Sequence, residues 1–174
     1  KELLYWWAEK GLRPNIIGEP SFVMMKRELA EKAGPFHPTM RQYLDSEYWT
    51  RCLLAADWYD LPDIVGKFRV HPGGASAQNE SMGKGMFERF DTFKLLLERV
   101  PKEDRPRMQK ALGKTFEQMI DRYLKGRKEG RKIDTAGSGE LKKFCLQHPV
   151  LILKAVLGFI FSKTIRRNTT RTDV

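Results

Sequence analysis

The second half of the chain shows helical periodicity and no strand pattern, and this feature constrains the fold more than any other. From residue 86 onward, apolar residues recur every three or four positions, as they do when a helix buries one face. The two clearest sets are Met86, Phe90, Phe93, Leu97 and Val100, and then Met108, Leu112, Phe116, Met119 and Tyr123. A polar linker at 126–139 and two further helices, in ELKKFCLQH and PVLILKAVLGFIFSKTIRR, complete the predicted helical part.

The first 74 residues mix short helices with strand-like runs. Helices are expected at residues 2–10, 28–34 and 45–56, and glycines stop the first two. Two runs, 22–25 and 58–71, are expected to be strands, the first buried and the second broken by a proline. The predicted fold class is therefore α/β, of the α+β kind in this fragment, followed by an all-helical extension.

Two or three short strands rarely form a stable sheet without further strands beside them. We therefore expect that additional strands are missing on the N-terminal side. The chain opens with Lys1 rather than methionine, directly in a helix-like segment. We therefore expect it to begin inside a larger protein or to be a processed product. Its expected parts are an α/β part at 1–74, a flexible glycine-rich loop at 75–85 and a basic helical extension at 86–174.

The excess positive charge is confined to the end of the chain. Residues 1–100 contain 14 Lys and Arg and 14 Asp and Glu, whereas residues 101–174 contain 18 and 8, which accounts for the net charge of +10. A basic tail of this kind favours an anionic surface, such as lipid headgroups or nucleic acid. Nucleic acid is the less favoured partner, because the sequence contains no recognised binding motif and no interleaving of basic and aromatic residues.

An apolar stretch near the C-terminus raises the question of a membrane. VLILKAVLGFIF, residues 150–161, is interrupted by Lys154 and is shorter than the roughly 20 residues that span a bilayer. Basic residues follow it, so residues 150–167 form either an interfacial helix on anionic lipid or a buried terminal helix. The sequence leaves both alternatives open.

Asp45 opens the stretch DSEYWTR and has two compatible interpretations. As an N-cap, its carboxylate would accept backbone N–H bonds from the first helical turn. As a general base, it would use the ionised form that a helix N-terminus stabilises. Glu47 lies near the positive end of the helix, and Arg51 is spaced to pair with it at i, i+4. Alternatively, Arg51 orients the carboxylate or holds a phosphate.

Arg69 and His71 lie at strand spacing before the loop GGASAQN. An imidazole and a guanidinium on one face suit an anion or a metal-bound diphosphate, and a surface histidine beside a solvated arginine fits equally well. One histidine does not build a metal site, and His37 and His148 are not spaced to assist it.

Several classes of site lack sequence support. GGASAQN is not a P-loop, because it lacks Gly-Lys-Ser/Thr, and no Gly-x-Ser-x-Gly, His-Glu-x-x-His or Cys-x-x-Cys motif occurs. Cys52 and Cys145 show neither metal-ligand spacing nor a disulfide pattern, which fits a reducing compartment. Hydrolase triads and zinc sites are therefore not expected.

Residues 17–76 resemble the C-terminal half of family 2 glycosyltransferases, the inverting enzymes of the GT-A fold. Three pieces occur in the order and spacing of that family: a Gly-x-Pro-Ser segment with an apolar strand and a basic pair, an Asp-x-Glu-x-Trp-x-Arg motif, and a Phe-Arg-x-His-x-Gly strand end. The second and third pieces are matched by Asp45, Glu47, Trp49 and Arg51, and by Phe68, Arg69, His71 and Gly73.

The resemblance implies roles for these residues. Asp45 would deprotonate the acceptor hydroxyl as it attacks the anomeric carbon of the sugar. His71 would help to hold a metal-bound diphosphate, with Mg²⁺ or Mn²⁺ as the implied cofactor, and Arg69 would add positive charge there.

The resemblance also implies residues that contact the donor. Glu47 and Arg51 are candidates on the predicted helix. Ser76 is a further candidate in the loop 72–79, which resembles the lid that orders over the donor sugar.

The donor-binding half of the family, a set of βα units that ends in an Asp-x-Asp metal motif, is absent from this sequence. DSE fills the position of the base, and YDLPD at 59–63 has unsuitable spacing. Leu44 stands where many relatives have an acidic residue. The implied function is part of an enzyme that moves a sugar from a nucleotide-sugar donor to an acceptor hydroxyl, in polysaccharide or glycoconjugate synthesis. The chain is expected to be inactive alone.

Two other functions stay open. In one, the chain is a non-catalytic helical module that binds an anionic membrane surface or a partner protein through its basic part. In the other, it is a subunit that a separate donor-binding chain completes. We expect a cytoplasmic location, with the inner face of the membrane as the site of any contact through residues 150–167.

Overall fold

The structure is a computed structural model and describes residues 1–64, 66–67, 69, 74 and 84–128, together with residues 146, 149–150, 153 and 157. By its contacts the chain divides into two compact units, Lys1–Leu112 and Gly113–Val174. The predicted division at residues 74 and 85 stays a prediction.

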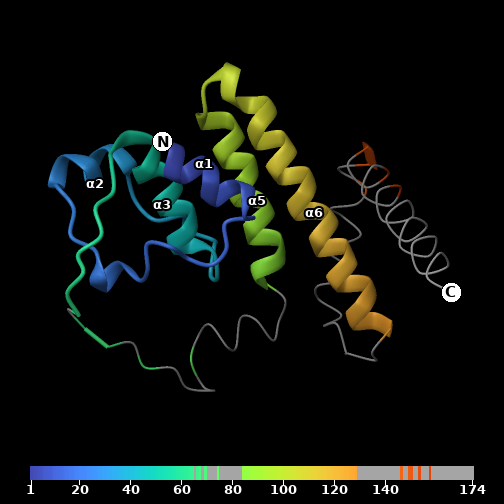
Figure 1. Ribbon diagram of the computed structural model, residues 1–174, viewed down its shortest axis with the longest axis horizontal. Coiled ribbons are helices and arrows are strands. Elements are labelled where there is room, and N and C mark those ends of the chain that lie inside the picture. Colours follow the sequence, from blue (N-terminus) through green and yellow to red (C-terminus); the bar gives the residue numbers. More distant parts are fainter. Residues whose placement is uncertain are drawn as a thin grey trace, which may run out of the picture. The chain divides into compact units, whose positions relative to one another are not determined.

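The elements that the structure describes are helices and short 3₁₀ turns (Figure 1). In chain order they are α1 (Glu2–Glu9), the 3₁₀ turn η1 (Pro20–Phe22), α2 (Arg27–Ala33), α3 (Leu44–Ala55), α5 (Lys84–Arg99), the 3₁₀ turn η2 (Lys102–Asp104) and α6 (Arg105–Lys128). The helices predicted at 2–10, 28–34 and 45–56 are confirmed as α1, α2 and α3, and the two apolar sets correspond to α5 and α6. In the part of the chain that the structure describes, none of the helices combines the length and the apolar character that a membrane span requires.

The predicted α/β fold, with the strands of a GT-A domain, is wrong for the described residues, which are helical and contain no strand. Val23 has extended dihedral angles (φ −111°, ψ 128°) but joins no ladder. Met24, expected to be buried, is 92% exposed, and Ile64 in the second predicted strand is 91% exposed. The reason is that an extended segment needs a neighbouring strand for its backbone hydrogen bonds, and the described residues offer none to these runs.

The predictions for the end of the chain fall almost wholly outside the described residues. Helix α6 runs to Lys128, so it includes the first three residues of the predicted linker at 126–139. Beyond it, only isolated helical positions such as Leu146 and Leu153 are described. The two C-terminal helices and the membrane contact therefore stay predictions.

Asp45 does not cap α3, contrary to one of its two interpretations. Tyr43 occupies the N-cap position without a side-chain cap hydrogen bond, Leu44 begins the helix, and Asp45 is the second helical residue. The first turn closes through the backbone, where the N–H of Glu47 donates to the carbonyl of Tyr43 at 2.8 Å. The carboxylate of Asp45 is thereby left for another role.

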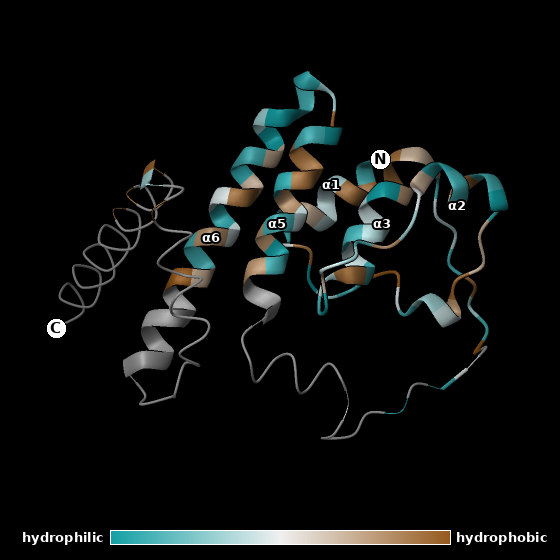
Figure 2. Ribbon diagram, turned by 180° about the vertical axis from the view of Figure 1, so that it is seen from behind, coloured by the Kyte–Doolittle hydropathy of each residue, from teal (hydrophilic) through white to brown (hydrophobic). Residues whose placement is uncertain are grey.

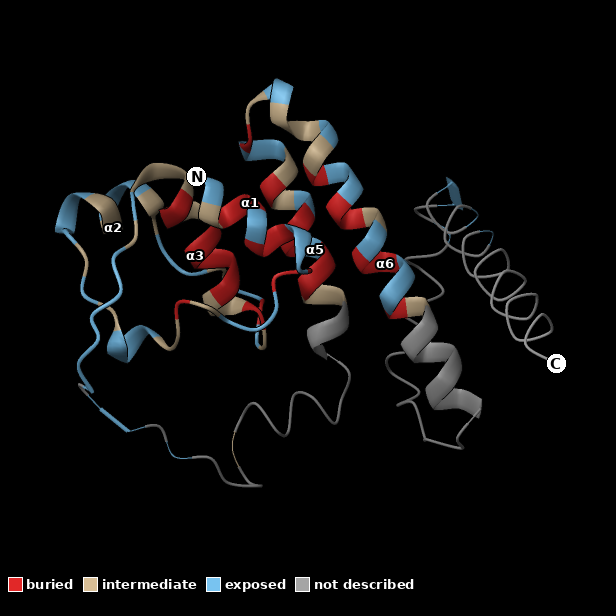
Figure 3. Ribbon diagram, in the orientation of Figure 1, coloured by how far each residue is buried: buried red, intermediate tan, exposed pale blue. Residues whose placement is uncertain are grey.

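Helix α3 packs against α1, α2 and α5. Buried residues lie on α1, α3, α5 and α6, whereas α2 has none (Figure 3). Along α5 and α6, hydrophobic and hydrophilic residues alternate, in keeping with the period that the sequence predicts (Figure 2). Large aromatic rings dominate the burial in the first unit, and fully buried examples are Tyr5, Trp7, Trp49, Phe90 and Phe93.

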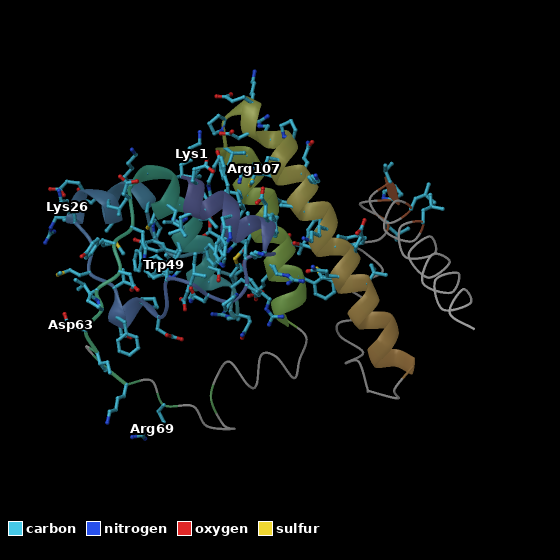
Figure 4. The ribbon with its side chains drawn as sticks, in the orientation of Figure 1. Lys1, Lys26, Trp49, Asp63, Arg69 and Arg107 are labelled. Carbon is cyan, nitrogen blue, oxygen red and sulfur yellow. The ribbon has the colours of Figure 1, made fainter. Side chains whose placement is uncertain are left out.

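Polar contacts tie α1 to η2 and to the first turn of α6. The hydroxyl of Tyr5 donates to Asp104 at 2.5 Å, and Nζ of Lys1 lies 2.7 Å from the same carboxylate. Arg107, labelled in Figure 4, donates to Glu9 at 2.7 Å and to Glu2 at 3.1 Å. Burial, and secondly the hydrogen bond to Asp104, raise the pKa of Tyr5 to about 12. The Tyr5 hydroxyl group therefore stays protonated, and able to donate to Asp104, across the physiological pH range.

Trp49 offers a test of this packing, because its ring is 2% exposed and its Nε1–H donates to the carbonyl of Gly18 at 3.0 Å. Trp49→Phe removes that donor and leaves a cavity, so we expect the free energy of unfolding to fall by about 1–3 kcal/mol in urea titrations. The matched control is Trp6→Phe, since Trp6 is 47% exposed; it should change the free energy by less than about 0.5 kcal/mol. Equal losses in the two variants would contradict this account of the core.

Candidate functional site

The candidate site lies at the start of α3, where Asp45 is half-buried. Burial, and secondly the negative charge of Glu19, raise the pKa of the Asp45 carboxyl group above its ordinary value of 3.8. Both effects disfavour the ionised form, in contrast to the expectation from the sequence that the start of the helix stabilises it. The carboxyl group therefore holds its proton more tightly than a solvated aspartate, and its ionised form is the stronger base.

Glu19 is held near Asp45 because its neighbour Gly18 is hydrogen-bonded to Trp49, one turn further along α3. Trp49 lies four residues after Asp45, on the same side of α3, and its indole N–H binds the carbonyl of Gly18 at 3.0 Å. Gly18 directly precedes Glu19, so this bond fixes the segment that carries the second carboxylate next to the helix. Figure 4 shows Trp49 in the middle of the side chains of this region. Sequence reasoning missed Glu19, because nothing in its spacing connects it with Asp45.

The segment before Glu19 is held by a turn that Asn15 organises. The Oδ1 atom of Asn15 accepts from the N–H groups of Ile17 at 3.2 Å and Gly18 at 3.1 Å, while its Nδ2 donates to the carbonyl of Gly18 at 3.0 Å. Gly18 has a φ of +96°, a conformation that side chains disfavour and glycine adopts freely. The backbone directly before Glu19 is therefore fixed by Asn15 and by Trp49.

Glu47, two residues after Asp45, lies in the opposite electrostatic environment. Its side chain is 1% exposed, and both carboxylate oxygens bind arginines. Oε2 accepts from Nη2 of Arg51 at 2.8 Å and from its Nε at 3.2 Å, and Oε1 accepts from Nη1 of Arg99 at 2.6 Å. The predicted i, i+4 pair of Glu47 and Arg51 is confirmed, and Arg99 of α5 is the partner that sequence reasoning missed.

Arg51 extends this cluster to α2. Its Nη1 donates to the carbonyl of Ala33, the last residue of α2, and its guanidinium lies 4.9 Å from the centre of the Tyr48 ring. Tyr48 in turn stacks on Phe36 at 4.2 Å between ring centres. Because Gly34 ends α2 with a φ of 76°, the chain turns sharply beside the guanidinium. Arg51 thus joins the end of α2 to α3.

The structure brings together three of the predicted site residues, Asp45, Glu47 and Arg51, on α3. Arg69 is exposed on the segment that follows α3, and Figure 4 shows it away from Trp49. His71 and Ser76 lie outside the described residues. The donor-binding roles of Glu47, Arg51, Arg69 and Ser76, and the metal-binding role of His71, stay predictions.

A metal site needs several donor side chains close together. Among the described residues, no group of three or more His, Cys, Asp or Glu side chains is placed to hold a metal ion. Asp45 and Glu19 form a pair, and both oxygens of Glu47 are bound to arginines. The described residues alone therefore do not fit the Mg²⁺ or Mn²⁺ ion that the resemblance implies.

Comparison with known proteins found one short similarity. A stretch of 44 residues, which is 25% of this chain, is 43% identical to an uncharacterized protein of Mycobacterium tuberculosis (strain CDC 1551 / Oshkosh). That stretch covers only 14% of the length of the mycobacterial protein, whose description states no activity. No family model and no solved structure matches the chain.

The cluster of Glu47, Arg51 and Arg99 predicts a large effect of neutralising its carboxylate. Glu47→Gln leaves two guanidinium groups beside a buried amide, so we expect the free energy of unfolding to fall by about 3 kcal/mol. The matched control is Glu31→Gln, since Glu31 is exposed on α2; it should cost less than about 0.5 kcal/mol. Urea titration of both variants measures the difference, and a loss at Glu47 as small as that at Glu31 would show that the cluster does not stabilise the fold.

Proposed function

We propose that this chain is the acceptor-side part of an inverting glycosyltransferase, in which Asp45 is the general base. One observation carries the proposal: Asp45 is half-buried beside Glu19, with its pKa raised, at the position where the resemblance expects the base. Carboxyl groups that a fold keeps in such an environment are more frequent at functional sites than on ordinary surfaces.

The proposed reaction is a single displacement. The acceptor oxygen attacks the anomeric carbon of the donor sugar while its proton moves to a carboxylate oxygen of Asp45. The bond between the anomeric carbon and the diphosphate oxygen breaks, the diphosphate leaves with the electron pair, and the configuration inverts. Asp45 raises the rate because it removes the proton as positive charge develops on the attacking oxygen.

The other parts of the proposal rest on the resemblance. Arg51, Arg69 and Ser76 would contact the donor, while Glu47, whose side chain is 1% exposed and binds two arginines, would act by holding Arg51. A divalent metal, held with the help of His71, would supply charge stabilisation for the leaving diphosphate in the complete enzyme. We assign no step to the metal, because the described residues alone do not fit it. The proposed place of action is the cytoplasm, at the inner face of the membrane if residues 150–167 bind lipid.

Asp45→Asn in the full-length protein tests the role of the base. We expect the rate of sugar transfer to fall by about 10²–10⁴-fold, because an amide cannot accept the proton, while binding of the nucleotide sugar stays nearly unchanged. Product formation and donor binding are measured on the same preparation. The control is Asp63→Asn, which removes an exposed carboxylate. Turnover of Asp45→Asn at the rate of the control would contradict the proposal.

The stability of the fold should also depend on Asp45 in a way that follows from its raised pKa. Below the ordinary value of 3.8 the group is protonated in the folded and the unfolded chain, so it contributes no difference. Between 3.8 and the raised pKa only the unfolded chain loses its proton, and ionisation therefore weakens the fold as the pH rises.

Asp45→Asn stays neutral at every pH, so it escapes this loss. We expect the Tm of Asp45→Asn, relative to that of the original chain, to be higher at about pH 7 than at about pH 3. Thermal unfolding at the two pH values, followed by circular dichroism, measures the change. A difference in Tm that is the same at both pH values would show that the carboxyl group is not perturbed.

A further inference from the structure

The three residues before Leu44, the first residue of α3, are hydrogen-bonded to the carboxylate of Glu88, which lies near the beginning of α5. Its Oε1 accepts from the backbone N–H of Arg41 at 2.8 Å, and its Oε2 accepts from those of Gln42 at 2.5 Å and Tyr43 at 2.9 Å. Hydrogen bonds to a charged acceptor are stronger than those between neutral groups, and three of them converge here on consecutive residues. Glu88 thus fixes the chain directly before α3 begins.

A second charged residue of α5, Arg99, binds the first turn of α3 itself. Arg99 donates to Glu47 at 2.6 Å, and Glu47 is buried in the first turn of α3. Glu88 and Arg99 are separated by about three helical turns, so they project from one face of α5. Asp45 lies midway in sequence between Tyr43, which Glu88 binds, and Glu47, which Arg99 binds.

Buried residues between these two anchors keep α5 against the same segment. Thr92 is fully buried; its hydroxyl donates to the carbonyl of Glu88 at 2.8 Å and lies 3.9 Å from the sulfur of Met40. Phe93 and Leu96 are fully buried as well. Because a packed interface of this kind has little freedom to slide, the two anchors hold the first turn of α3 at a fixed distance from α5.

We propose that Glu88 and Arg99 are positioning residues, which hold the first turn of α3 so that the carboxylate of Asp45 keeps the orientation and burial that a general base needs. This inference rests on the proposed function. It also extends the functional unit to α5, which lies outside residues 17–76 and belongs by sequence to the helical extension. Neither residue touches the reacting atoms; both act through the backbone or the side chains of α3.

The test uses variants that keep the charge and change the geometry. Glu88→Asp retains a carboxylate that is too short to reach all three N–H groups, and Arg99→Lys retains a cation that lacks the planar fork of a guanidinium. Matched controls are Glu98→Asp on α5 and Arg27→Lys on α2, both at exposed positions. Circular dichroism confirms that each variant is folded before the site is measured.

The first readout is the pKa of the Asp45 carboxyl group, from ¹³C NMR titration of this chain. We expect Glu88→Asp and Arg99→Lys to shift it by at least about 0.5 unit, since the burial of the group changes, while the controls leave it in place. A pKa that neither variant moves overturns the inference. A shift in one variant alone overturns the role of the other residue.

The second readout is sugar transfer by the full-length protein. We expect kcat to fall by about 10-fold or more in both variants with KM for the donor nearly unchanged, because a displaced base slows the chemical step. If Asp45→Asn abolishes transfer while Glu88→Asp and Arg99→Lys leave kcat intact, this inference fails and the proposed function stands. If the protein transfers no sugar, the proposed function fails, and a shifted pKa in the first readout still shows that α5 positions Asp45.

Discussion

The buried carboxylate of Glu47 is the constraint on which the first unit depends. A carboxylate that is removed from water must be paired and hydrogen-bonded to stay ionised, and Arg51 and Arg99 bind its two oxygens from α3 and α5. Arg51 also binds the last carbonyl of α2. Glu47, through these two arginines, therefore links α2, α3 and α5.

The same helical turn carries a second carboxylate, that of Asp45, whose electrostatic environment is the opposite of that of Glu47. Glu47 binds two cations, whereas Asp45 is half-buried beside the like charge of Glu19. Environments that differ in this way assign different roles to chemically similar groups. Glu47 stabilises the fold, and Asp45 carries an electrostatic cost that is easier to understand at a functional site than as part of a core.

Local interactions are predictable from this sequence, and long-range ones are not. The helices follow from apolar spacing, and the pair of Glu47 and Arg51 follows from its i, i+4 separation. Arg99 lies 52 residues from Glu47, and no pattern distinguishes it or Glu88 from the other charged residues of α5. Glu19 is placed beside Asp45 by the hydrogen bond from Trp49 to the carbonyl of Gly18, and sequence spacing does not reveal such a bond. The predicted strands fail for the same reason, since a strand is specified only together with its partner.

If Asp45 is a general base whose burial raises its pKa, the pH dependence of kcat/KM for sugar transfer by the full-length protein will report that pKa. We expect an acidic limb, in which activity rises with pH through an apparent pKa above 3.8 that agrees with the value for Asp45 from NMR. A profile that is flat across this range, or whose limb persists unchanged in the residual activity of Asp45→Asn, would contradict it.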